Sequence, residues 1–235
     1  MDCSKFALMD LPNWLNAISS LLLAIIAIFH EPIRSRLSAP KLKATILSAA
    51  PDCVSVPVSL NKNESANAFY LRLRIENLVS NCFFNRAVAK NVEVFAEKLE
   101  KKNVNGGWDD VSSFPPMNLK WANRPQHEIY SPAIAPGMWR HCDLGHIVDP
   151  EFKAKAGEFN QKLLNNADKV SLAFDLVVSP NHRGHIVGPG EYRLNVVISS
   201  ENAQPKNSTI RIFISGEWKP EESEMFNKEV AVSII

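Results

Sequence analysis

The segment Tyr70-Leu71-Arg72-Leu73-Arg74-Ile75 decides the fold class, because polar and apolar side chains alternate along it. Successive side chains of an extended strand point to opposite faces. Leu71, Leu73 and Ile75 would therefore share a buried face, while Arg72 and Arg74 point outward. Such alternation predicts a half-buried strand of an antiparallel sheet.

The same pattern recurs from residue 41 to the end of the chain. Val92, Val94 and Ala96, for example, would line one face of a further strand. The polar stretch at residues 200–208 is expected to form a hairpin loop between two late strands. Strands are expected at residues 41–47, 70–75, 92–96, 118–122, 137–148, 170–178, 192–199, 209–215 and 230–235.

Two short helices are expected among these strands. Asp149 can cap a helix whose first residue is Pro150, and apolar residues then recur at helical spacing. Pro220 is followed by three glutamates within four residues, which is typical of a helix start. Together the elements predict a mainly β domain over residues 41–235, an antiparallel two-sheet sandwich with one or two short helices.

Residues 11–29 form an apolar stretch that carries no ionisable side chain. A helix of this length rises about 28 Å, close to the roughly 30 Å hydrocarbon core of a bilayer. Trp14 suits the headgroup boundary. The flanks lack the basic start and small-residue cleavage pattern of a signal peptide. We therefore expect a single retained transmembrane helix within residues 1–33, followed by a juxtamembrane linker at residues 34–40.

Basic side chains are concentrated after this stretch. Lys5 is the only basic side chain before it, whereas four lysines and arginines follow by Lys43. The positive-inside rule then places the N-terminus outside and the domain over residues 41–235 in the cytoplasm. The four cysteines are widely scattered, as expected of reduced thiols. This predicts a single-pass protein of the inner membrane that contacts the lipid bilayer through residues 11–29.

The segment Gly188-Pro189-Gly190-Glu191-Tyr192 resembles the Pro-Gly-x-Tyr turn that leads into a late strand of immunoglobulin-like and fibronectin-like domains. In such domains the tyrosine hydroxyl bonds back to the upstream backbone. Residues 71–77 followed by 89–94 are similar to the strand–loop–strand of many bacterial immunoglobulin-like modules. The resemblance implies a bacterial, membrane-anchored immunoglobulin-like β-sandwich, and a fold resemblance alone implies no activity.

Composition and motifs exclude several classes of function. The 235 residues contain 26 Lys+Arg against 25 Asp+Glu, so the basic excess typical of nucleic-acid-binding proteins is missing. A hydrophobic content of 46% excludes a wholly disordered chain. The sequence contains no Gly-x-Ser-x-Gly, Gly-x-x-x-x-Gly-Lys or His-Glu-x-x-His motif. We therefore expect neither an enzyme nor a cofactor.

Two groups of side chains could bind a ligand or partner. Arg72 and Arg74 point outward and could meet an anionic group. Trp108, Trp121 and Trp139 lie at or near expected strand ends, where aromatic side chains could line a pocket or a partner surface. A solvated face for the arginines and core packing for the tryptophans are the alternatives.

A third group could hold a metal ion. On a strand over residues 137–148, Cys142 and His146 would share one face, and His185 could supply a third ligand for zinc or iron. Ordinary strand and loop side chains without a common ligand are the alternative.

Three hypotheses of function follow. The first is a non-catalytic, membrane-anchored module whose cytoplasmic sandwich binds a protein partner, a second copy of the chain or a small ligand. The second is a membrane-disrupting effector of a bacterial defence or stress system, triggered through the sandwich, because the architecture resembles that of small antiphage membrane effectors. The third is a metal-dependent hydrolase that uses Cys142, His146 and His185.

Overall fold

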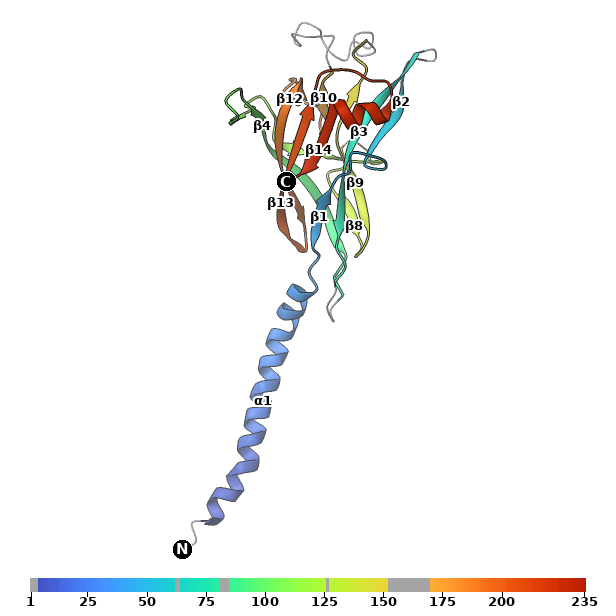
Figure 1. Ribbon diagram of the computed structural model, residues 1–235. Coiled ribbons are helices and arrows are strands. Elements are labelled where there is room, and N and C mark those ends of the chain that lie inside the picture. Colours follow the sequence, from blue (N-terminus) through green and yellow to red (C-terminus); the bar gives the residue numbers. More distant parts are fainter. Residues whose placement is uncertain (1–3, 62–63, 81–84, 126, 152–169) are drawn as a thin grey trace.

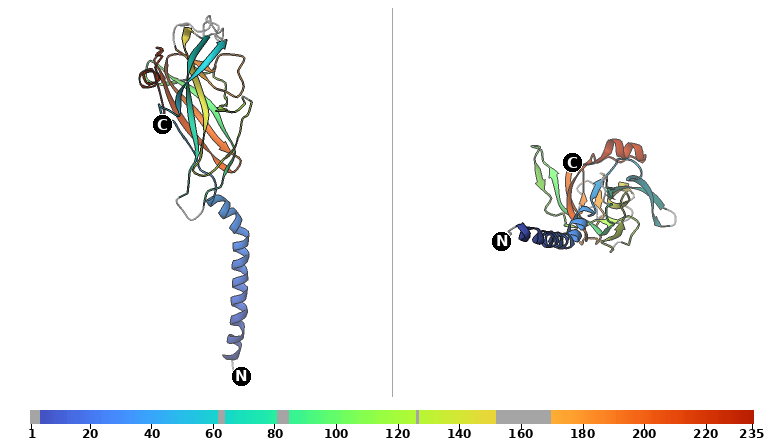
Figure 2. Two further views of the ribbon diagram at one scale, coloured as in Figure 1. Left: turned by 90° about the vertical axis from the view of Figure 1, so that its right-hand side faces the viewer. Right: turned by 90° about the horizontal axis from the view of Figure 1, so that it is seen from below.

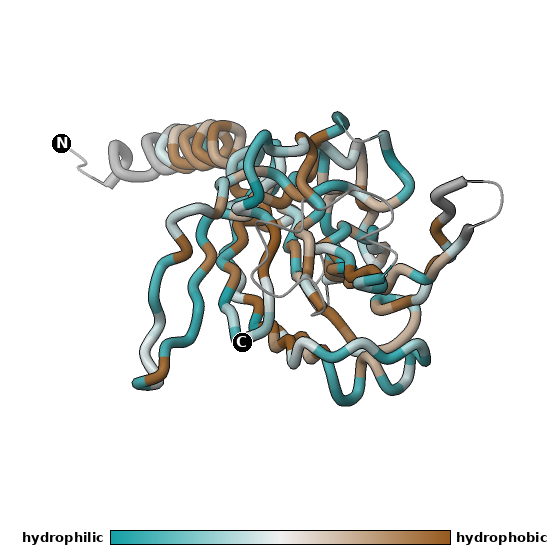
Figure 3. Tube along the Cα trace, turned by 90° about the horizontal axis from the view of Figure 1, so that it is seen from above, coloured by the Kyte–Doolittle hydropathy of each residue, from teal (hydrophilic) through white to brown (hydrophobic). Residues whose placement is uncertain are grey.

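The computed structural model describes residues 4–61, 64–80, 85–125, 127–151 and 170–235. A long N-terminal helix leads into a β-rich body, as Figure 1 shows. This helix, α1 (Ser4–Leu37), has 34 residues. Its part Trp14–Leu37 is long and apolar enough to cross a membrane, and none of that part is buried against the rest of the protein. The helix projects from one end of the body (Figure 2) and is mostly apolar along its middle (Figure 3).

Helix α1 continues four residues into the stretch expected as a linker. It ends at Leu37 because Pro40 disfavours helical backbone at Ala39. Ser38 stabilises this end by donating both its N–H and its hydroxyl to the Arg34 carbonyl, at 2.9 and 2.8 Å. The connection to the first strand is therefore short.

Two antiparallel sheets form the body, as the alternation predicted. The first sheet contains β1 (Leu42–Thr45), β2 (Cys53–Asn61), β3 (Glu64–Asn77), β7 (Lys120–Trp121), β9 (Trp139–Val148), β10 (Leu172–Phe174) and β11 (Ile186–Val187). Its order is β1-β3-β9-β10-β11, with β2 paired to β3 and β7 paired to β9. The deciding segment is thus part of β3, a central strand.

The second sheet lies across from the first (Figure 1). It contains β4 (Ala89–Lys102), β5 (Trp108–Asp110), β6 (Met117–Asn118), β8 (Ser131–Ile134), β12 (Gly190–Ser200), β13 (Ala203–Ile214) and β14 (Val230–Ile234). Its order is β14-β13-β12-β4-β5, with β6 and β8 also paired to β4. Each of the nine expected strands overlaps an observed one, whereas β2, β5, β8 and β11 were not predicted.

One hydrophobic core lies between the two sheets. Leu71, Leu73 and Ile75 of β3 are fully buried, as the alternation predicted, and belong to the same cluster as Leu194 and Ile212 of the second sheet. Burial of each such side chain stabilises the fold by about 1.5–3 kcal/mol. The core holds the two sheets together and leaves their outer faces to carry polar side chains.

The prediction of a hairpin loop over residues 200–208 is wrong. Strand β12 runs to Ser200 and β13 begins at Ala203, so two residues connect them. The first residues of β13 are mostly exposed. Because this end of the hairpin extends past the core, both of its faces can be polar, and the alternation that marks a half-buried strand is lost.

The two expected helices differ in outcome. After Pro220, the short helix α3 (Glu222–Glu224) continues into the π-helical turn η2 (Met225–Glu229). Met225 and Phe226 of this turn are buried in the core. The other expected helix falls mainly on residues 152–169, which lie outside the described residues.

Candidate functional site

A β-bulge in β9 decides which side chains of that strand face outward. Strands β3 and β9 pair residue by residue except at Leu144, which is an extra residue on β9. An extra residue reverses the alternation of faces beyond it. Cys142, before the bulge, is fully buried in the core, whereas His146, beyond it, lies on the outer face opposite Tyr70. The prediction that Cys142 and His146 share a face is therefore wrong.

The outer face of β3 and β9 carries two clusters of charged and aromatic side chains, which we together call the outer-face network. Its members lie on these two strands and on the segments that follow β10 and precede β2. They are Asp52, Tyr70, Arg72, Arg74, Trp139, His141, Asp143, His146 and Asp175.

Asp52 is the centre of one half of this network. Its side chain is fully buried, and its Oδ1 lies 2.8 Å from the Arg74 guanidinium and 2.9 Å from Nε2 of His141. Its Oδ2 accepts a hydrogen bond from the Leu47 N–H at 3.0 Å. The centre of the Trp139 ring lies 4.5 Å from the centre of the His141 ring. It lies 4.8 Å from the guanidinium carbon of Arg74. Arg74 therefore faces a carboxylate and an indole.

The other half of the network contains two carboxylates. Arg72 pairs with Asp143 at 3.1 Å, and its guanidinium lies 5.4 Å from the ring of Tyr70. Burial and the nearby charge of Asp175 raise the pKa of Asp143 to about 6, because together they outweigh the attraction of Arg72. Nδ1 of His146 lies 2.9 Å from Oδ1 of Asp175.

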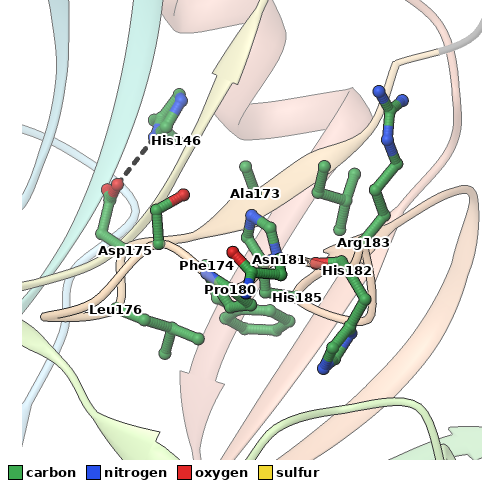
Figure 4. Close-up of a pocket in the computed structure, with 12 residues that line it drawn as sticks. His146, Ala173, Phe174, Asp175, Leu176, Pro180, Asn181, His182, Arg183 and His185 are labelled. Carbon is green, nitrogen blue, oxygen red and sulfur yellow. Dashed lines mark hydrogen bonds and ion pairs between the residues drawn. The ribbon is translucent and has the colours of Figure 1, made fainter. Parts of the chain in front are cut away.

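A pocket of about 430 Å³ opens beside the Asp175 end of the network. Figure 4 shows His146 and Asp175 joined on one side of this pocket, with the side chains of the β10–β11 connection around the rest. The second carboxylate oxygen of Asp175, Oδ2, is buried and has no hydrogen-bond partner among the described residues. The polar lining consists of His146, Asp175, Ser179, Asn181, His182, Arg183 and His185, and the apolar lining of Ala173, Phe174, Leu176, Pro180 and Ile186.

Close packing holds the connection that forms the pocket. Gly184 lies so near the backbone that a Cβ placed on it would come within 1.6 Å of the Ser113 carbonyl oxygen. Phe174 packs edge-to-face against Phe114, with the ring centres 5.3 Å apart. Burial lowers the pKa of His185, so this imidazole is held toward its neutral form. The pocket therefore offers a neutral imidazole and a carboxylate oxygen that needs a donor.

The structure places the predicted site residues in different parts of the molecule. His146 and His185 both line the pocket, but Cys142 does not. Cys142 donates its thiol to the Lys120 carbonyl at 3.4 Å, and burial raises the pKa of that thiol, which opposes the thiolate that a metal needs. Across the described ranges, no group of three or more His, Cys, Asp and Glu side chains is placed to hold a metal ion.

The three predicted tryptophans do not gather at one surface. Trp121 is buried in the core and donates its indole N–H to the Ile129 carbonyl at 2.9 Å. Trp108 packs on the Arg193 guanidinium at 3.9 Å in the second sheet. Trp139 alone is part of the outer-face network.

Sequence reasoning missed Asp52 and Asp175. Each is a single acid between apolar or small residues, in Pro51-Asp52-Cys53 and Phe174-Asp175-Leu176. An acid at such a position is expected to be buried and therefore to need a basic or hydrogen-bonding partner. This signal was present in the sequence, but the sequence does not show which residues are the partners.

Comparison with known proteins identifies no relative of this chain. A scan against protein-family models, a search of curated proteins and a search of solved structures each give no match for this chain. The site must therefore be interpreted from its own geometry.

Proposed function

We propose that this chain is a membrane-anchored, non-catalytic binding module. In this proposal α1 spans the inner membrane of a bacterial cell, and an immunoglobulin-like sandwich on the cytoplasmic side receives a small polar ligand or a polar group of a protein partner. The pocket beside His146 and His185 is the binding site. The sandwich assignment is supported by the two facing sheets and by the Tyr192 hydroxyl, which donates to the Gly188 carbonyl at 3.0 Å.

The observation that carries the proposal is the buried Oδ2 of Asp175, which has no hydrogen-bond partner among the residues that the structure describes. A buried carboxylate oxygen without a hydrogen bond costs free energy, and a ligand that brings an N–H or O–H donor would recover that cost. The neutral imidazole of His185 and the amide of Asn181 add donors and acceptors to the same lining. We therefore expect a ligand that carries several N–H or O–H groups.

Binding rather than catalysis is favoured by the surroundings of the His146–Asp175 pair. Ser179 lines the same pocket and is a potential nucleophile, but no hydrogen bond joins its hydroxyl to His146 within the described residues. An activated serine needs that contact, so that the imidazole can take its proton. A fluorophosphonate probe checks this directly, and labelling of Ser179 would contradict a non-catalytic role.

The test is a thermal-shift screen of the full chain in mild detergent against amino sugars, polyamines and nucleosides. A ligand at about 100 times its Kd stabilises the folded state by about 2.7 kcal/mol, which raises the Tm of a domain of this size by roughly 5–10 °C. The shift should be lost in Asp175→Asn and His185→Ala. His127→Ala, an exposed histidine outside the pocket, is the matched control and should keep the shift. An equal shift in all four proteins would place binding elsewhere.

A second candidate function, the membrane-disrupting effector, is favoured by polar side chains within the span. Asn16, Ser19 and Ser20 are exposed on α1, and such residues form contacts between transmembrane helices. Overexpression of the full chain would then arrest growth, and replacing Ala24 and Ile25 by lysine would abolish the arrest. Normal growth on overexpression would contradict this function.

A further inference from the structure

A second hollow, which we call the juxtamembrane groove, lies where α1 meets the sandwich. Its walls are the last turn of α1, the chain that leads into β1, and the connection between β12 and β13, and its volume is about 870 Å³. Figure 1 shows this end of the β12–β13 hairpin near the end of the helix. The charged side chains of the lining are Arg36, Lys41, Arg86, Lys206 and Glu201.

The four cations of the groove have no carboxylate partner in the described part of the chain. Within the described parts of the chain no ion pair includes Arg36, Lys41, Arg86 or Lys206. The one acid of the lining, Glu201, accepts a hydrogen bond from the Asn91 amide at 2.9 Å. The groove therefore carries a clear positive charge.

Arg86 provides a hydrogen-bond donor in the groove that needs an acceptor. One terminal nitrogen of its guanidinium donates to the Ala39 carbonyl at 3.1 Å, which holds the side chain against the end of the helix connection. Its Nε is buried and has no acceptor among the described residues. A buried guanidinium N–H without an acceptor is costly, so an anionic oxygen in the groove would be stabilised.

The depth of the groove relative to a bilayer follows from the helix. A hydrocarbon core of about 30 Å takes about 20 helical residues, which from Trp14 reaches roughly residue 33. The headgroup layer adds about 5–8 Å beyond the core on each side and would therefore contain Arg36, which lies about 5 Å further along the helix than residue 33. The end of the groove formed by the helix thus lies at the level of the lipid phosphates.

We propose that the juxtamembrane groove binds the phosphate of an anionic lipid headgroup. The inference rests on the proposed membrane anchoring. The Arg86 guanidinium would donate to the phosphate oxygens, and Lys41 and Lys206 would approach as point charges. Lipid phosphate is the favoured source because α1 holds one end of the groove in the headgroup layer, whereas free phosphate must bind from bulk solution. A bound headgroup would connect the β12–β13 hairpin to the helix end and so restrict the orientation of the sandwich.

The test uses the full chain in vesicles of equimolar phosphatidylglycerol and phosphatidylcholine. After mild detergent extraction, native mass spectrometry counts the lipids that the protein retains. Phosphatidylglycerol should be preferred by at least about tenfold, since each of the three basic residues near an anionic surface can contribute up to about a fivefold gain in affinity. The triple variant Lys41→Gln, Arg86→Gln, Lys206→Gln should reduce the preference to near parity.

Matched variants separate lipid binding from folding and from total charge. Arg124→Gln, Lys219→Gln, Lys228→Gln removes the same charge away from the groove and should keep the preference. Lys41→Gln, Lys206→Gln leaves the hydrogen bond of Arg86 intact and should still lose most of the preference. Parity in the unmodified chain, or an equal loss in the control, would overturn the inference.

Two further arms identify the source of a failure. If the chain does not float with vesicles of pure phosphatidylcholine, the proposed membrane anchoring fails. If it floats but shows no preference for phosphatidylglycerol, only the groove assignment fails. Displacement of phosphatidylglycerol by excess inorganic phosphate would make free phosphate the ligand and overturn the lipid source.

Discussion

The outer faces of the two sheets carry the same kinds of ion pair in different surroundings. On the first sheet, the Asp52 and Asp143 side chains are 0% and 8% exposed and pair with Arg74 and Arg72. On the second sheet, Lys98 pairs with Asp110, and these side chains are 43% and 64% exposed. The chemistry is alike, but water reaches only the second set freely.

The difference shows that burial, and not the number of ion pairs, decides what a charge contributes to stability. An exposed pair exchanges hydration for a screened attraction and contributes little. A buried pair has lost its hydration, so removal of one partner leaves the other uncompensated. Variants on the two faces should therefore differ strongly in the free energy of unfolding.

The largest effect is expected for Asp52→Ala. This change leaves the Arg74 guanidinium, His141 and the Leu47 N–H without their acceptor, and breaking a buried pair in this way costs about 3–5 kcal/mol. Denaturant unfolding of the full chain in detergent, followed by tryptophan fluorescence, measures the loss. A loss as small as that of an exposed pair would show that water reaches Asp52 in solution.

A pH-dependent effect of similar size is expected for Asp143. Its pKa in the folded protein, about 6, is above its ordinary value of 3.8, so the folded state binds the proton more tightly than the unfolded state. The stability that this proton contributes is fully present below about pH 4 and is lost as the pH rises through 6.

The shift in the pKa of Asp143 corresponds to a change of about 3 kcal/mol in the free energy of unfolding. Asp143→Asn cannot titrate, so wild type should lose about this much relative to the variant between pH 4 and pH 7. Parallel pH profiles of the two proteins would contradict the assignment.

A smaller effect is expected for Glu191→Gln on the second sheet. Glu191 pairs with Lys102 at 2.7 Å and with Arg211, and its pKa is lowered mainly by the hydrogen bond from Lys102. Because the basic partners are well exposed, the loss should be below about 1 kcal/mol and should shrink further at high salt. A loss that is large and independent of salt would mean that this pair is effectively buried.

The smallest effect is expected for Lys98→Gln. Lys98 is well exposed and pairs with Glu100 and Asp110, so solvent can replace both contacts. The unfolding midpoint should not change beyond the error of the measurement. A clear decrease would remove the contrast between the two faces.

Local patterns in the sequence were sufficient to predict a mainly β fold with one long apolar helix. The alternation at residues 70–75 predicted a half-buried strand, and β3 has Leu71, Leu73 and Ile75 in the core. The apolar stretch at residues 11–29 predicted a long apolar helix, and α1 contains it. Both features depend on the spacing of side chains along a few turns or residues of one element, which any single sequence displays.

The candidate sites were decided by tertiary structure. Leu144 becomes a bulge only because β3 pairs across it, and that pairing moves Cys142 into the core and His146 to the pocket. The pocket also needs Asp175 beside His146, 29 residues apart along the chain. Whether a charged side chain is buried, and what it meets there, depends on such distant segments. Alternation along one strand determines its two faces, but it carries no information about the neighbouring strand or the register.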